Sequence, residues 1–163
     1  MASDGKRLRI SWLGWWRLVR QLRRRGGGRR ESGAFLLGRR DEQGGTISAF
    51  VFYDDIDPGA LSRGYVHLAG PALNKVWERC AATGLEVLAD VHTHPGRADQ
   101  SPSDQEHPMI AIRGHTALII PNFARSALNL RAVGVYRHLG ARKWVVLPGP
   151  KPGWRGLTLD QDK

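Results

Sequence analysis

Two histidines and an aspartate lie close together in the stretches DVHTHP (90–95) and SPSD (101–104). His92 and His94 are two residues apart at the end of a predicted strand, so their side chains project from the same face. A Pro-Gly pair ends that strand, and the following loop can return Asp104 to the same point. Two imidazoles and one carboxylate are the ligand set of a catalytic zinc, which keeps a fourth position open for water. Zinc lowers the pKa of that water towards about 7 and polarises a carbonyl.

The same residues also have an explanation without a metal. Histidines at strand ends hydrogen-bond locally, and SPSD is typical of a helix start, with Ser101 as N-cap, Pro102 at the first position and Asp104 in a capping box. The two explanations are partly compatible, because a capped turn fixes the Asp104 carboxylate. Two further carboxylates are rival ligands, Asp90 on the face of the histidines and Asp99 on the loop. We expect Asp90 to belong to the core or to support the ligands, and Asp99 to be solvated.

The order and spacing of these residues resemble the JAMM signature of the JAB/MPN zinc metalloproteases. That signature is a His-x-His, a short loop and a Ser-x-x-Asp, with a glutamate well upstream. The upstream stretch ESGAFLLG (31–38) is similar to the family's strand in which a glutamate precedes an apolar run ending in glycine. Six residues separate His94 from Ser101, one fewer than is usual in the family, and a glycine-containing loop absorbs such a deletion. The resemblance covers about residues 8–147.

The resemblance implies a fold and a role for each site residue. The fold would be α/β, a cytidine-deaminase-like JAB/MPN domain with a curved mixed β-sheet flanked by helices. His92, His94 and Asp104 would bind one Zn²⁺ per chain. Glu31 would be the general acid/base, and Ser101 would help to hold the tetrahedral intermediate. Taken alone, Glu31 has the alternative of an exposed ion pair with the arginines that precede it.

The activity implied by the resemblance is that of a minimal, prokaryotic-type, deubiquitinase-like isopeptidase or peptidase. It would cleave after the C-terminus of a ubiquitin-like protein, either to deconjugate it or to process its precursor. The expected partners are a ubiquitin-like protein or its conjugate and the proteins of a conjugation-type operon. A non-catalytic scaffold of the same fold, which only binds partners, is the alternative from a different functional class, although such members have typically lost ligands.

Hydrophobic periodicity predicts the elements that must position these residues. A strand and a helix are expected over 8–25, a hairpin of strands at 33–40 and 46–53, a short strand at 65–68, a helix at 71–84, a strand at 86–92, a helical turn at 103–107, and strands near 116–120, 132–137 and 143–147. This order predicts an α/β fold with a mixed sheet. The chain is expected to divide into three segments: a basic strand and helix that pack on the domain (1–30), the catalytic core (31–147), and an extended or mobile Pro/Gly-rich tail (148–163).

Residues outside the motif have structural explanations in most cases. Trp12, Trp15 and Trp16 are expected to form the core face of the first helix, and Cys80 to lie in a helix core. Trp154, in the tail, is expected to dock on the protein's own surface or on a partner. The sequence indicates no role for His67, His115 and His138. His107, which precedes a proline, is expected on the surface.

The net charge of +10 on 163 residues is a local feature. Residues 1–30 hold ten of the 25 Lys/Arg residues and one acid, so the rest of the chain is nearly neutral. No apolar run is long enough for a membrane span, and the N-terminus lacks the apolar core of a secretory signal. A single cysteine fits a reducing compartment. We therefore expect a cytoplasmic protein.

The basic segment has three interpretations beyond a solvated face. A helix rich in Trp and Arg can lie on an anionic membrane, track a nucleic-acid backbone or bind an acidic protein. If the tryptophans pack on the sheet, only the charge remains available, which favours an acidic partner protein over nucleic acid. A nucleic-acid-binding module built on residues 6–30 stays as the alternative.

Overall fold

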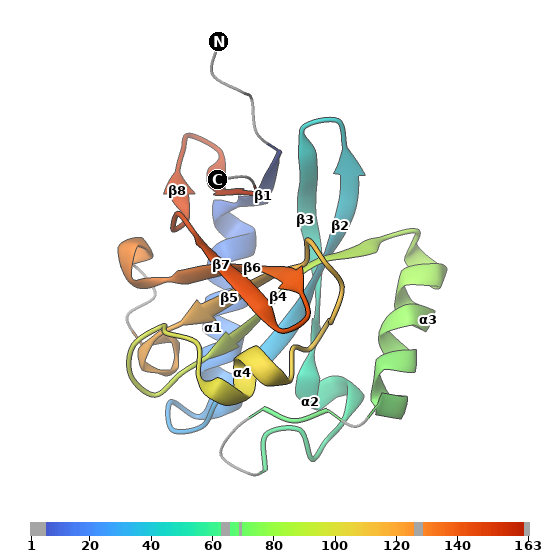
Figure 1. The fold of residues 1–163 in the computed structure, drawn as a ribbon, viewed down its shortest axis with the longest axis vertical. Helices are drawn as coiled ribbons and strands as arrows, with labels where there is room; N and C mark the ends of the chain where they lie inside the picture. The colour runs from blue at the N-terminus through green and yellow to red at the C-terminus, as the bar shows by residue number, and fades with distance from the viewer. Residues whose placement is uncertain (1–5, 63–65, 69, 126–128, 162–163) are drawn as a thin grey trace.

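Nine strands of the described residues form one mixed sheet in the order β7-β6-β5-β4-β2-β3-β1-β9-β8 (Figure 1). The computed structural model describes residues 6–62, 66–68, 70–125 and 129–161. The strands are β1 (Arg7–Ser11), β2 (Gly33–Asp41), β3 (Gly44–Phe52), β4 (Glu86–Thr93), β5 (Thr116–Ile120), β6 (Gly134–Gly140), β7 (Lys143–Leu147), β8 (Lys151–Pro152) and β9 (Gly156–Asp160). The helices are α1 (Trp12–Gly26), α2 (Tyr53–Ile56), α3 (Leu73–Thr83) and α4 (Pro102–Glu106), with short 3₁₀ turns η1 (Gly70–Ala72), η2 (Asn122–Ala124) and η3 (Leu130–Ala132).

The apolar run of β2 is buried on both faces because a helix covers each side of the sheet. Successive side chains of a strand point to opposite faces. Leu36 accordingly packs in the core beneath α1, while Phe35 and Leu37 pack in the core beneath α3. β2 pairs antiparallel with β3 and with β4, which confirms the predicted hairpin and its central strand.

Helix α1 has well-defined ends and a buried face. The Ser11 hydroxyl caps its N-terminus by accepting a hydrogen bond from the Gly14 amide at 3.0 Å. Gly27, in the left-handed region at φ 60°, ends it. Leu18 and Leu22 are completely buried against the sheet. None of the helices in the described residues has the length and apolar composition needed to cross a membrane.

The pairing of the central strands brings the beginning of one strand and the ends of two others to the same side of the sheet. β4 pairs antiparallel with β2, with Gly33 opposite His92. β4 also pairs parallel with β5, with His92 opposite Ile119. The beginning of β2 therefore lies beside the ends of β4 and β5, and this side carries the candidate site.

Two predictions made from local patterns are wrong. Trp15 is buried on the core face of α1, but 42% of Trp12 and 53% of Trp16 are exposed, so those two indoles do not belong to the core. The short strand expected at 65–68 is not found at 66–68, and Tyr65 lies outside the described residues.

The C-terminal segment was expected to be an extended or mobile tail; it is extended, but it forms part of the sheet. β9 pairs antiparallel with β1 along its whole length, and Leu157 and Leu159 are 1% exposed in the core beneath α1. β1 in turn pairs parallel with β3. The first and last segments of the chain are thus parts of the same sheet as the central segment.

Replacing Leu159 with alanine should destabilise the protein by about 2–5 kcal/mol, the usual cost of emptying a buried leucine site. Trp154 is 93% exposed and provides the matched control in the same segment. Its replacement by alanine should change the free energy of unfolding by less than about 0.5 kcal/mol. Chemical denaturation of both variants measures the difference, and equal effects would mean that β9 does not belong to the sheet.

Candidate metal centre

His92 and His94 come from the last residues of β4, where the alternation of the strand turns both rings to one face. Their Nε2 atoms lie 2.9 Å apart, and both residues are buried. Thr93, between them, points to the other face, where its hydroxyl accepts a hydrogen bond from the Ser32 amide at 3.0 Å. That bond fastens the beginning of β2 to the end of β4 and so fixes the position of both histidines.

Asp104 reaches the histidines from the first turn of α4. The predicted capping box is present, because the Ser101 hydroxyl accepts from the Asp104 amide at 3.1 Å and the Ser101 amide donates to Asp104 Oδ2 at 2.7 Å. The carboxylate then meets both rings, with Oδ1 3.3 Å from His92 Nε2 and Oδ2 3.2 Å from His94 Nε2. The capping geometry and the convergence on the histidines therefore coexist in one side chain.

The three side chains fit a single metal ion. One ligand atom from each lies within 4.8 Å of the others. Two ligands of a tetrahedral zinc with bonds of about 2.0–2.1 Å lie about 3.3 Å apart, and the contacts among the three side chains are close to that. Two imidazole nitrogens and one carboxylate oxygen also leave a fourth position for water or substrate. His92, His94 and Asp104 are thus the residues that would hold a metal.

The charges of the cluster shift its pKa values. Burial alone would raise the pKa of Asp104, but the hydrogen bonds from His92 and His94 hold it far below its ordinary value. Burial would lower the pKa of His94, and Asp104 raises it above its ordinary value. The carboxylate therefore remains ionised, as a metal ligand must be.

A cleft of about 770 Å³ opens onto the cluster, and Glu31 and Ser101 line it with His92 and Asp104. Glu31 precedes β2, and its carboxylate accepts a hydrogen bond from the Val66 amide at 3.3 Å. Burial raises the pKa of Glu31 above its ordinary value, against the opposing charges of both histidines. The structure therefore brings all five predicted site residues to one place, although they come from three separate segments.

The turn η2 supports the end of β4 behind the cluster. The Phe123 amide donates to the His94 carbonyl at 2.8 Å, and the Asn122 amide donates to the Gly96 carbonyl at 3.0 Å. Asn122, Phe123 and Ala124 all have positive φ values, from 51° to 62°, a conformation that costs L-residues energy. These hydrogen bonds hold the strained turn against the end of β4.

Asp90 is buried beneath the site and is not part of the ligand set. Its Oδ1 lies 2.6 Å from His115 Nε2, and the Tyr53 hydroxyl donates to its Oδ2 at 3.4 Å. No local pattern in the sequence points to His115, because its contact with Asp90 depends on the pairing of β4 with β5. The rival carboxylate Asp99 is exposed beside Arg97, as expected.

Other residues complete the walls of the cleft. His107 is exposed, as predicted, yet it lines the cleft together with His67 and Trp144. The Trp144 indole donates to the Gln105 carbonyl at 3.2 Å, and its ring packs on His138 with centroids 4.8 Å apart. Trp144 carried no signal in the sequence, because only the position of β7 at the edge of the sheet brings it near α4.

Comparisons with known proteins agree with this geometry. The family model of prokaryotic homologs of the JAB domain matches residues 15–127. A relative from Sinorhizobium fredii (strain NBRC 101917 / NGR234), named probable metalloprotease y4jG, is 37% identical over 65 residues, which cover 40% of this chain and 40% of that protein. The aligned part is thus well under half of either chain.

Two solution structures share the fold at low sequence identity. A protein from Desulfitobacterium hafniense matches with a TM-score of 0.61 and 13% identity, over 85% of this chain and 88% of that one. A protein from Salinibacter ruber (strain DSM 13855) matches with a TM-score of 0.57 and 16% identity, over 90% and 95% of the two chains. The family match spans every residue from Glu31 to Asp104, and the chain belongs to the prokaryotic homologs of the JAB domain.

Proposed function

We propose that this protein is a zinc-dependent peptidase or isopeptidase that cleaves after the C-terminus of a ubiquitin-like protein. One observation carries the proposal: His92, His94 and Asp104 converge to within 4.8 Å at a cleft that Glu31 and Ser101 also line. The family and the name of the Sinorhizobium relative support a peptidase-like role. His92, His94 and Asp104 would hold the zinc ion, which would lower the pKa of a bound water and polarise the carbonyl group of the substrate.

Glu31 has the position and the protonation behaviour of a general base. Its carboxylate lines the cleft together with the ligands. Burial raises its pKa towards neutral pH, and a base with such a pKa accepts a proton more effectively than an ordinary glutamate does. Glu31 takes the proton of the attacking water and then delivers it to the leaving amine. The Val66 amide holds the carboxylate in place for both transfers.

Ser101 is placed to stabilise the negative charge that develops on the carbonyl oxygen. Its oxygen accepts the Asp104 amide hydrogen, so its own hydroxyl hydrogen is left for a partner in the cleft. A donor preorganised in this way acts on the transition state more than on the substrate. The same hydrogen bond orients the hydroxyl and the ligand Asp104 together.

The cleft suits an extended peptide. Its volume of about 770 Å³ is enough for a few residues and far too small for a folded domain. Leu68, Met109 and Trp144 give it apolar walls. The C-terminal tail of a ubiquitin-like protein would enter as an extended chain while its folded part stays outside.

Replacing Ser101 with alanine should lower turnover by about 10- to 1000-fold while the metal is retained. It should also cost about 1 kcal/mol in stability, because the N-cap of α4 is lost. Ser48→Ala, an exposed serine on β3 that does not line the cleft, is the matched control and should leave all three quantities near wild type. Steady-state rates, metal analysis and denaturation measure the three effects. An unchanged rate in Ser101→Ala would remove it from the mechanism.

The substrate class is tested with fusions. Bacterial ubiquitin-like proteins joined through their C-termini to a reporter are incubated with the protein, with and without a chelator, and the products are identified by mass spectrometry. The same reporter behind an unrelated folded domain and an equal linker is the control. We expect one cut, directly after the ubiquitin-like C-terminus and absent with chelator. Equal cutting of both fusions would show a general peptidase, and no cutting by zinc-loaded protein would favour a scaffold.

A further inference from the structure

The solvent side of α1 carries exposed aromatic rings and arginines. Trp15, Leu18 and Leu22 fill the core side of the helix. Trp12 and Trp16 remain about half exposed on the other side. The objection that the tryptophans are occupied by the core, which favoured an acidic protein over nucleic acid, therefore does not hold.

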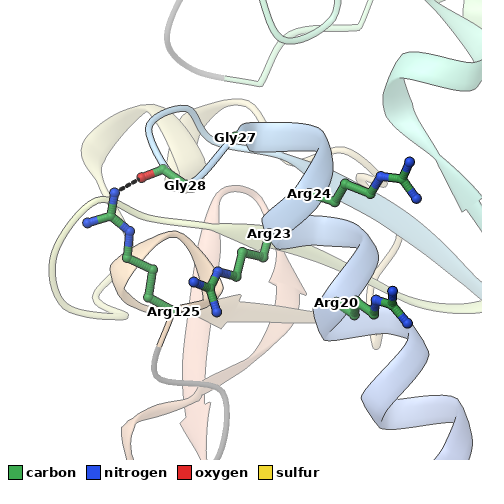
Figure 2. A pocket seen from close by; sticks show the side chains of 6 residues that line it. All are labelled: Arg20, Arg23, Arg24, Gly27, Gly28 and Arg125. Carbon is green, nitrogen blue, oxygen red and sulfur yellow. Dashed lines mark hydrogen bonds between the residues drawn. The ribbon is translucent and has the colours of Figure 1, made fainter.

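Arginines continue this exposed face to the end of the helix. Arg20 links the two parts, because its guanidinium lies over the Trp16 ring, 5.1 Å from the centroid. Arg20, Arg23 and Arg24 line a shallow pocket of about 480 Å³ around the helix end. Figure 2 shows Arg20 and Arg24 projecting together from the helix, with Arg23 on the side nearer Arg125. We refer to Trp16 with these four arginines as the Trp/Arg face.

Arg125 reaches the pocket from a distant part of the sequence. It follows η2, and its guanidinium donates to the Gly28 carbonyl across the turn that ends α1 (Figure 2). Gly28 has a φ of 65°, so the chain turns sharply there, and the Gly28 carbonyl holds the arginine side chain. A fourth guanidinium is thereby fixed beside three others in spite of their mutual repulsion.

These arginines have no acidic partners within the described ranges. Arg25, on the other side of the same helix, forms ion pairs with Asp54 and Asp55 and lies over the Phe52 ring, so its role is structural. No ion pair of that kind joins Arg20, Arg23, Arg24 or Arg125 to a described carboxylate. Cations in the last turn do favour a helix through its dipole, which accounts for Arg23 and Arg24. The dipole explains neither Arg125 nor the exposed Trp16.

We propose that the Trp/Arg face binds single-stranded nucleic acid. Guanidinium groups match phosphate oxygens in a bidentate way, and every cation in this pocket is an arginine. Bases stack on aromatic rings and on guanidinium planes, both of which the Trp16–Arg20 pair presents. The arginines recur along the helix at 17, 20, 23 and 24, a track that suits the regular charges of a phosphodiester strand.

Two other anionic partners fit the face less well. A membrane surface would need a broad apolar face that is free to insert. The Trp12 indole donates to the Gly153 carbonyl at 3.0 Å, and the charged Arg20 guanidinium lies over the Trp16 ring, so Leu13 is the one exposed apolar side chain of α1 without such a contact in the described residues. The carboxylates of a folded acidic protein would pair with the arginines but would not stack on the Trp16 ring.

The binding site and the candidate metal centre share no lining residue. The proposal therefore stands independently of the proposed peptidase activity. It is tested on the full-length protein by the fluorescence anisotropy of a labelled oligothymidylate of about 20 nucleotides, long enough for one site.

The first arm measures charge. The logarithm of the affinity should fall with the logarithm of salt concentration with a slope of about −2.8, or about 0.7 for each of four arginines. Arg23→Gln/Arg24→Gln should halve that slope and weaken binding at least about tenfold at low salt. Arg79→Gln/Arg113→Gln removes the same charge from exposed positions elsewhere and should keep the wild-type slope. Equal losses in the two double variants would overturn the site.

The second arm measures stacking and the class of partner. Trp16→Ala should weaken oligonucleotide binding about fivefold or more, because base stacking is lost. Trp77→Ala, at a tryptophan on α3 that is 43% exposed, should not weaken it. Polyglutamate and vesicles containing anionic phospholipid are titrated in parallel. Tighter binding of either probe than of the oligonucleotide, or no effect of Trp16→Ala, would contradict nucleic-acid recognition by this face. Circular dichroism of each variant confirms that it is folded.

Discussion

His92→Ala/His94→Ala is expected to lower the zinc content from about one ion per chain to less than about a tenth of that. The two Nε2 atoms lie 2.9 Å apart, and their removal leaves Asp104 as a lone carboxylate in the cluster. One carboxylate binds zinc far more weakly than three convergent ligands, because the fold no longer preorganises a site. Elemental analysis after gel filtration in metal-free buffer measures the content.

The same cleft provides the control for this result. His67 and His107 also line the cleft but do not belong to the cluster. His67→Ala/His107→Ala removes the same number of imidazoles from the same cavity and should retain zinc at the wild-type level. Full occupancy in His92→Ala/His94→Ala, or equal loss in both double variants, would show that the metal lies elsewhere.

Glu31→Gln is expected to reduce turnover by at least about 100-fold while zinc is retained. Glutamine keeps the size of the side chain and an oxygen that accepts the Val66 amide, so only the ability to take a proton is lost. Glu106→Gln, an exposed carboxylate on α4, is the matched control and should cleave at the wild-type rate. Wild-type cleavage by zinc-loaded Glu31→Gln would assign the base to another residue.

The pH dependence of the wild-type rate carries the same information. A general base must be deprotonated, so the rate falls as the pH decreases through its pKa. Because burial raises the pKa of Glu31, the acid limb should lie above the ordinary glutamate value of 4.5. An acid limb that persists unchanged in the residual activity of Glu31→Gln would mean that another group limits the reaction.

Local patterns in the sequence predicted much of the site. The alternation of a strand places His92 and His94 on one face, and the capping box fixes Asp104 against its own helix start. Both devices act within a few residues, so the sequence reveals them directly. Only the family resemblance identified Glu31 as a site residue, because the antiparallel pairing of β2 with β4 joins segments about 60 residues apart.

The errors arose where distant parts of the chain meet. β9 was missed because prolines and glycines surround the alternation of Leu157 and Leu159, and only the unpaired edge of β1 gives that strand a place. The pair of Asp90 and His115 required the register of two parallel strands, which no local pattern contains. A second kind of error is local. The helical spacing of the apolar residues predicts Trp16 on the core face, although it stands about 100° around the helix from Trp15.

Metal removal followed by metal return is the most direct test of the proposed centre. Cleavage of a ubiquitin-like fusion is measured before dialysis against a chelator, after it, and after one equivalent of zinc is restored. We predict that cleavage disappears with the metal, returns with zinc to wild-type protein, and does not return to His92→Ala/His94→Ala or to zinc-loaded Glu31→Gln. Cleavage that persists in metal-free protein, or that zinc restores equally to those variants, would contradict a zinc peptidase built from these residues.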